Sequence, residues 1–147
     1  MKFSFLKNRN FLLLIVLIIS VSIGSFGGYR VHSAIVRETI VSQCRVICTD
    51  AVNSFIHWKN TGDSAEYWQG VSSYYAFMCL TDTLYEERSY DYICFNKLYS
   101  YMVLYPERCQ NTMDELIAAL DELARNFEEP NTYEYITKYT NVLEYTH

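Results

Sequence analysis

The chain has little of what turns require, with only 5 Gly and 2 Pro among 147 residues. So few turn formers argue against a β-sandwich of many short strands, and they exclude a collagen-like repeat or a proline-rich linker. Hydrophobic residues make up 50% of the chain, which excludes a disordered protein because ample apolar surface is available for burial. The length fits one domain.

Recognisable catalytic and nucleotide-binding signatures are also missing. The chain has no G-x-S-x-G nucleophile motif, no C-x2-C pair and no D-x-[DN]-x-[DN]-G calcium loop. None of its three histidines stands at metal-ligand spacing from a cysteine. We therefore predict no catalytic residue, no cofactor and no metal site.

Acidic residues are absent before Glu38, and this part of the chain contains a long apolar segment. Residues 1–10 carry Lys2, Lys7 and Arg9, and residues 11–29 are uncharged, beginning with FLLLIVLII. About 18 helical residues rise roughly 27 Å, close to the thickness of a bilayer core. We predict a cytoplasmic tail (1–10), a single transmembrane signal anchor (11–29) and an extracytoplasmic domain (30–147). The alternative is a cleaved signal peptide and a secreted domain, since small residues follow the apolar run.

The predicted exported part is acidic. Residues 30–147 contain nine Lys and Arg against 17 Asp and Glu, a net charge of −8. This charge disfavours nucleic acid as a partner and disfavours adsorption to anionic lipid. The expected contacts are the membrane, through residues 11–29, and a protein.

From residue 30 onward the apolar residues recur at three- and four-residue steps, which predicts an all-α antiparallel bundle of about five helices. The first covers residues 31–60 and ends at Gly62. Asp63 with Glu66 forms a capping box that opens a second helix running to Glu87. We place one stripe of this second helix against the core and treat Asp82 as a candidate buried acid; the stripe is Trp68, Val71, Tyr75, Met78 and Tyr85.

The remaining helices are bounded by prolines and further capping boxes. A third helix spans residues 90–104 and ends before Pro106. Pro130 separates the last two helices. Each of them begins at a capping box, formed by Thr112 with Glu115 and by Asn131 with Glu134.

Cysteine is the most informative residue type, since an odd count of five leaves at least one thiol unpaired within a monomer. Counting residues from the expected turns places four cysteines in one layer of the core, with Cys109 in the loop after Pro106. Three readings remain open: buried free thiols, one disulfide joining Cys79 to Cys44 or Cys94, and a metal or redox-active thiol site. The predicted thiol cluster is Cys44, Cys48, Cys79 and Cys94.

Tyrosine is unusually frequent, with 14 residues. A tyrosine ring supplies apolar contact area while its hydroxyl seeks a polar partner, which suits interaction surfaces. The candidate interaction surface consists of tyrosines expected off the core stripes: Tyr67, Tyr74, Tyr90, Tyr92, Tyr133 and Tyr135.

Together these features predict a membrane-anchored helical domain outside the cytoplasm, acting as a non-enzymatic interaction or scaffold module of the cell envelope. A thiol-based enzyme or sensor is the first alternative. The second is a bundle that binds a small ligand between its first three helices.

Overall fold

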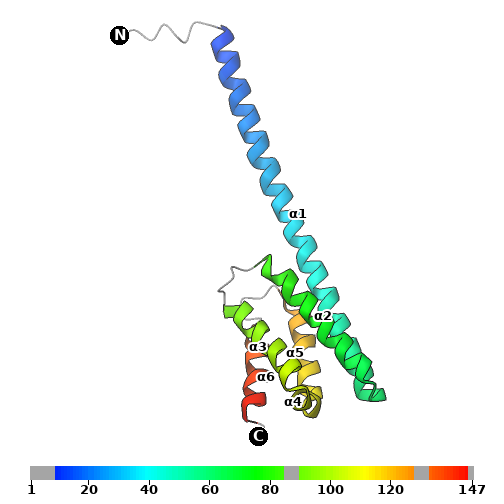
Figure 1. The fold of residues 1–147 in the computed structure, drawn as a ribbon. Coiled ribbons are helices and arrows are strands. Elements are labelled where there is room, and N and C mark those ends of the chain that lie inside the picture. The colour runs from blue at the N-terminus through cyan, green and yellow to red at the C-terminus, as the bar shows by residue number, and fades with distance from the viewer. Residues whose placement is uncertain (1–8, 85–89, 128–132, 146–147) are drawn as a thin grey trace. The chain divides into compact units, whose positions relative to one another are not determined.

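The computed structural model describes the backbone of residues 9–84, 90–127 and 133–145, and the side chains of Ser20 and of residues 31–84, 93–127 and 133–144. It divides into two units, residues 1–38 and residues 39–147. The described part contains helices and no strand, which confirms the all-α prediction (Figure 1). The helices are α1 (Arg9–Thr61), α2 (Ser64–Asp82), α3 (Tyr90–Leu104), α4 (Pro106–Asn111), α5 (Met113–Arg125) and α6 (Tyr133–Tyr145).

The turn between α1 and α2 forms at the predicted residues. Gly62 has φ +73°, a left-handed conformation that glycine adopts without strain, and its amide donates to the Trp58 carbonyl at 2.7 Å. Asp63 then caps α2, because its carboxylate accepts from the Ala65 amide at 2.9 Å. Local sequence therefore determines this turn.

The α3–α4 junction adds a helix that was not predicted. α3 ends at Leu104, as expected from Pro106. The same proline then occupies the first turn of α4, where its missing amide hydrogen is not needed and its fixed φ suits the helix. Cys109 thus lies buried in α4 and not in a loop.

Two other helix ends differ from the predictions. α2 ends at Asp82, five residues before Glu87. Thr112 makes no capping bond to α5, because its hydroxyl lies 2.8 Å from the Arg108 carbonyl and 2.9 Å from the Tyr139 hydroxyl. That predicted capping box is wrong, whereas the box at Asn131 lies outside the described residues.

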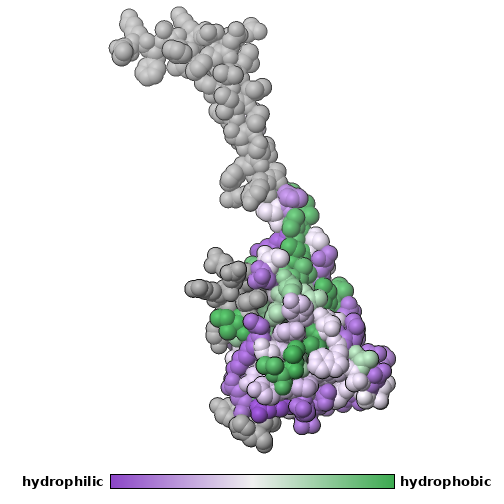
Figure 2. Space-filling model, in the orientation of Figure 1, coloured by the Kyte–Doolittle hydropathy of each residue, from purple (hydrophilic) through white to green (hydrophobic). Residues whose placement is uncertain are grey.

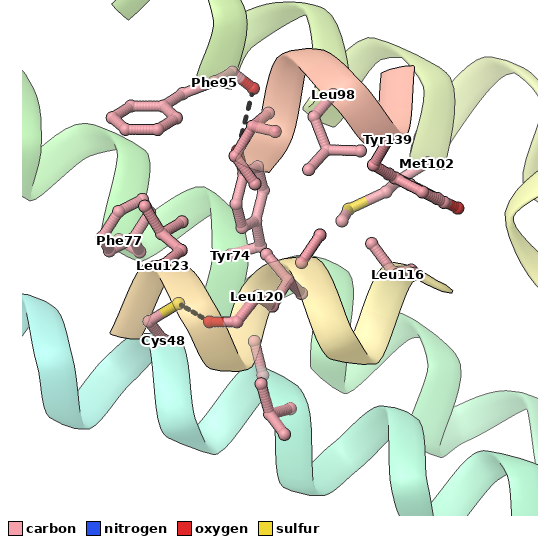
Figure 3. Packing of buried hydrophobic residues seen from close by; sticks show 14 of the residues in the cluster. Cys48, Tyr74, Phe77, Phe95, Leu98, Met102, Leu116, Leu120, Leu123 and Tyr139 are labelled. Carbon is pink, nitrogen blue, oxygen red and sulfur yellow. Dashed lines mark hydrogen bonds between the residues drawn. The ribbon is translucent and has the colours of Figure 1, made fainter. Parts of the chain in front are cut away.

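The core of the second unit lies where α3 packs on α2 and α6, and α5 packs on α6. Cys48 connects α1 to it, donating through Sγ to the Leu120 carbonyl of α5 at 3.4 Å (Figure 3). Aromatic rings meet edge to face in its centre, with Phe77 5.4 Å from Phe95 and 5.5 Å from Phe127. Packing in this core fixes α2, α3, α5 and α6 and so determines which of their residues face outward.

Within the helical segments whose side chains the structure describes, no stretch combines the length and the hydropathy needed to span a bilayer. Apart from Ser20, the side chains of the predicted anchor, residues 11–29, lie outside the described part. The anchor stays a prediction from the sequence.

Candidate functional site

The rotation of α2 about its axis decides which of its aromatic side chains face solvent. Tyr67 and Tyr74 are 1% and 0% exposed, whereas their neighbours Trp68 and Tyr75 are each 47% exposed. Successive helical residues point about 100° apart, so a small rotation buries Tyr67 and Tyr74 in place of the predicted Trp68 and Tyr75. Val71 and Met78 are buried as predicted. The buried residues of α2 are Tyr67, Gly70, Val71, Tyr74, Phe77, Met78 and Thr81.

Two hydroxyl groups explain why tyrosine tolerates these core positions. The Tyr67 hydroxyl donates to the Met102 carbonyl at 3.0 Å. The Tyr74 hydroxyl donates to the Phe95 carbonyl at 3.2 Å, as Figure 3 shows. Both bonds join α2 to α3 and satisfy a buried polar group at each end. The prediction that Tyr67 and Tyr74 form an interaction surface is therefore wrong.

A close approach between α1 and α2 favours the same rotation. Gly70 faces Phe55, and a Cβ atom added to Gly70 would lie only 2.7 Å from Phe55 Cε1. Any larger residue at position 70 would force the buried Phe55 ring or the helix backbones to shift. Glycine lets the Phe55 ring, itself 0% exposed, lie directly against the α2 backbone.

The outward face of α2 carries an aromatic surface, defined here as Trp68, Tyr75 and Tyr99 of α3. The Trp68 ring meets the buried Tyr67 ring edge to face at 5.4 Å, and the Tyr75 ring lies 5.1 Å from that of Tyr99. Figure 2 shows pale and green areas interrupting the purple surface of this unit. The sequence analysis placed Trp68 and Tyr75 in the core, so it missed this surface.

Of the other predicted tyrosines, the two whose side chains the structure describes, Tyr133 and Tyr135, do not join the aromatic surface. Tyr133 is half-buried against the core, and the side chains of Tyr90 and Tyr92 lie outside the described residues. Tyr135 lines a groove between α5 and α6 with a volume of about 390 Å³. We name this the α5–α6 groove; its lining residues are Glu115, Ala118, Ala119, Glu122, Tyr135, Lys138, Tyr139 and Val142.

The predicted thiol cluster is brought together only in part. Cys44, Cys48 and Cys94 are buried, but Cys79 is exposed, and all five cysteines are free thiols. The cause is again the rotation of α2, since Cys79 follows Tyr75 by one turn and shares its outward face. Asp82, the candidate buried acid, is exposed for the same reason.

Burial disfavours the reactive thiolate form of Cys44, Cys48 and Cys109. It raises the pKa of Cys44 to about 11 and also that of Cys48, for which the nearby Cys44 and Asp121 add smaller upward shifts. Burial likewise raises the pKa of Cys109 to about 11, although the nearby hydroxyl groups of Tyr139 and Tyr67 partly oppose this shift. Because the thiolate is the reactive form, we expect these groups to react slowly at neutral pH.

A metal centre finds no support in the described part of the chain, which brings no three His, Cys, Asp or Glu side chains together for one ion. Comparison of the whole chain with protein-family models, with curated proteins and with solved structures finds no match. The aromatic surface and the α5–α6 groove are accordingly argued from their own chemistry.

Proposed function

We propose that this protein is a membrane-tethered interaction module that binds a partner protein through its aromatic surface outside the cytoplasm. One observation carries the proposal: Trp68 and Tyr75, two turns apart on α2, are each 47% exposed. Trp and Tyr are enriched where protein interfaces bind most strongly.

Support from the core makes these rings suitable for binding. Trp68 is held edge-on by Tyr67, whose hydroxyl is bonded to Met102, and Tyr75 lies against Tyr99. A ring whose orientation is already restricted loses little conformational entropy when a partner covers it. The polar residues beside the rings, Gln69 and Ser72, are exposed and suit the wet rim of a protein interface.

The two alternatives have less support. A thiol enzyme needs a reactive thiolate, and the raised pKa values of Cys44 and Cys48 disfavour one. A ligand cavity between the first three helices would need space that three side chains, each at most 1% exposed, fill: Phe55, Tyr67 and Tyr74.

Photo-crosslinking in the source cells tests the proposal. With p-benzoylphenylalanine in place of Ser72, between Trp68 and Tyr75, we expect one discrete adduct with another protein. The adduct should disappear in the W68A/Y75A variant. As a control, the same photo-reactive residue at Asn53, an exposed position of α1, should not give it. No adduct from position 72, or the same adduct from position 53, would refute binding at the aromatic surface.

The membrane tether and its orientation have a separate test. Cys79 is exposed, so a membrane-impermeant maleimide should label the full-length protein in intact cells, and C79S should abolish the labelling. Labelling only after lysis would place the helical domain in the cytoplasm and contradict the proposal. Intact mass of the mature protein distinguishes a retained anchor from a cleaved signal peptide.

A further inference from the structure

We infer that the α5–α6 groove is a second binding site, which accepts an amphipathic helix with two basic residues seven positions apart. This inference concerns residues different from the aromatic surface, so either can fail without the other.

The floor of the groove is apolar and low. Ala118 and Ala119 present only methyl groups, so a second helix can approach the α5 backbone closely. Val142, 39% exposed, and the ring of Tyr139 complete the apolar lining from α6. A volume of about 390 Å³ lies at the lower end of binding pockets and holds a few aliphatic side chains.

The walls carry unequal charge. Glu115 and Glu122 both stand on the α5 side, and Lys138 stands on the α6 side. The two glutamates are separated by seven residues, two helical turns, and therefore lie about 10.5 Å apart along the helix axis. A partner helix that runs along α5 meets both carboxylates when its own cations have the same spacing.

The charge pattern also determines the face and the orientation of the partner. On the partner helix, the residues three and four positions after the first cation lie on the same face as the two cations. Aliphatic side chains at these two positions therefore point into the groove. An acidic residue on the side of the partner helix that faces α6 would meet Lys138. Mixed charge of this kind steers association and disfavours incorrect registers.

A second copy of this chain is a poor occupant. Residues 30–147 carry a net charge of −8, so two copies repel each other as the acidic wall is approached. A basic partner helix instead neutralises the two glutamates.

A designed peptide tests the site on the full-length protein in nanodiscs of zwitterionic lipid, which does not itself attract a basic peptide. The probe is a fluorescent 15-residue Ala-based helix with Lys at positions 4 and 11 and Leu at positions 7 and 8. Anisotropy should show saturable binding, weakened at least tenfold in E115Q/E122Q. The matched control, D50N/E107Q, removes two exposed acids elsewhere and should bind as the parent protein does.

Each other outcome overturns the inference. Equal weakening in E115Q/E122Q and D50N/E107Q would show general attraction to an acidic protein. Equal binding of a peptide with Glu at positions 4 and 11 would show that the wall charge is irrelevant. No saturable binding of the lysine peptide would reject the groove as a helix site.

Discussion

The rings of Tyr67 and Trp68 meet edge to face, with centroids 5.4 Å apart and planes at 83°, although one residue is buried and the other is half exposed. The buried ring is itself held by its hydroxyl bond to Met102. The exposed indole therefore rests on a side chain that the core fixes in place. Seven residues later, Tyr74 and Tyr75 repeat the sequence of a buried ring followed by a half-exposed one.

The first prediction separates the two members of the Tyr67–Trp68 pair. Y67F removes the hydroxyl that donates to Met102 and leaves a buried carbonyl without that bond, which should cost about 1 to 2 kcal/mol of unfolding free energy. W68F changes an exposed ring and should cost less than about 0.5 kcal/mol. Urea unfolding of the full-length protein in detergent, followed by circular dichroism, measures both. Equal costs would mean that the rotation of α2 is wrong.

The second prediction concerns the contact between α1 and α2. G70A should destabilise the fold by about 1 kcal/mol, because overpacking costs roughly 1 to 3 kcal/mol whereas the gain in helix propensity is only about 1 kcal/mol. The new Cβ atom would lie 2.7 Å from Phe55 Cε1. A double-mutant cycle with F55L checks the cause, since the smaller side chain should make G70A less costly. Additive effects of F55L and G70A would contradict the proposed clash.

The contrast between helix ends and helix rotation shows what the sequence can predict. Gly62, Asp63 and Pro106 act on their own neighbours, so the end of α1, the start of α2 and the end of α3 follow from local sequence. The capping box predicted at Thr112 is wrong because a residue distant in sequence, Tyr139, offers the Thr112 hydroxyl another hydrogen-bond partner. Only tertiary structure reveals that competition.

The rotation of α2 is decided by contacts that are remote in sequence. Stripes beginning at Tyr67 and at Trp68 are almost equally apolar, so periodicity alone does not choose between them. The contact of Gly70 with Phe55 and the bonds from α2 hydroxyls to α3 carbonyls make the choice. Asp82 is a polar residue on the rejected stripe, and it is a signal in the sequence that favours the correct rotation.

The third prediction concerns thiol accessibility. Cys79 is the exposed cysteine, whereas the other four are buried. Maleimide labelling of the folded protein at neutral pH should therefore show one fast thiol, and C79S should remove the fast phase. In denaturant, maleimide should label all five thiols of the parent protein and four thiols of C79S. Fast labelling that persists in C79S would contradict the outward position of Cys79.

The fourth prediction is a loss of stability in alkali. An ordinary thiol ionises near pH 8.5 and an ordinary phenol near pH 10. Burial raises the pKa of Cys44 and of Cys109 to about 11 and raises the pKa of Tyr67, Tyr74 and Tyr139 as well. The unfolded chain therefore releases these protons first, and proton loss favours unfolding.

The full stabilisation should be present below about pH 8.5 and should decline as the pH rises towards 11. Each such group contributes at most about 1.4 kcal/mol per pH unit. Urea unfolding at steps from pH 7 to 10.5 measures the slope. C44A should reduce it because one of the shifted groups is gone, and S72A, which removes an exposed hydroxyl, should not. A stability that stays constant over this range would mean that these thiols and phenols remain solvated in the folded protein, which would be incompatible with the core described for the second unit.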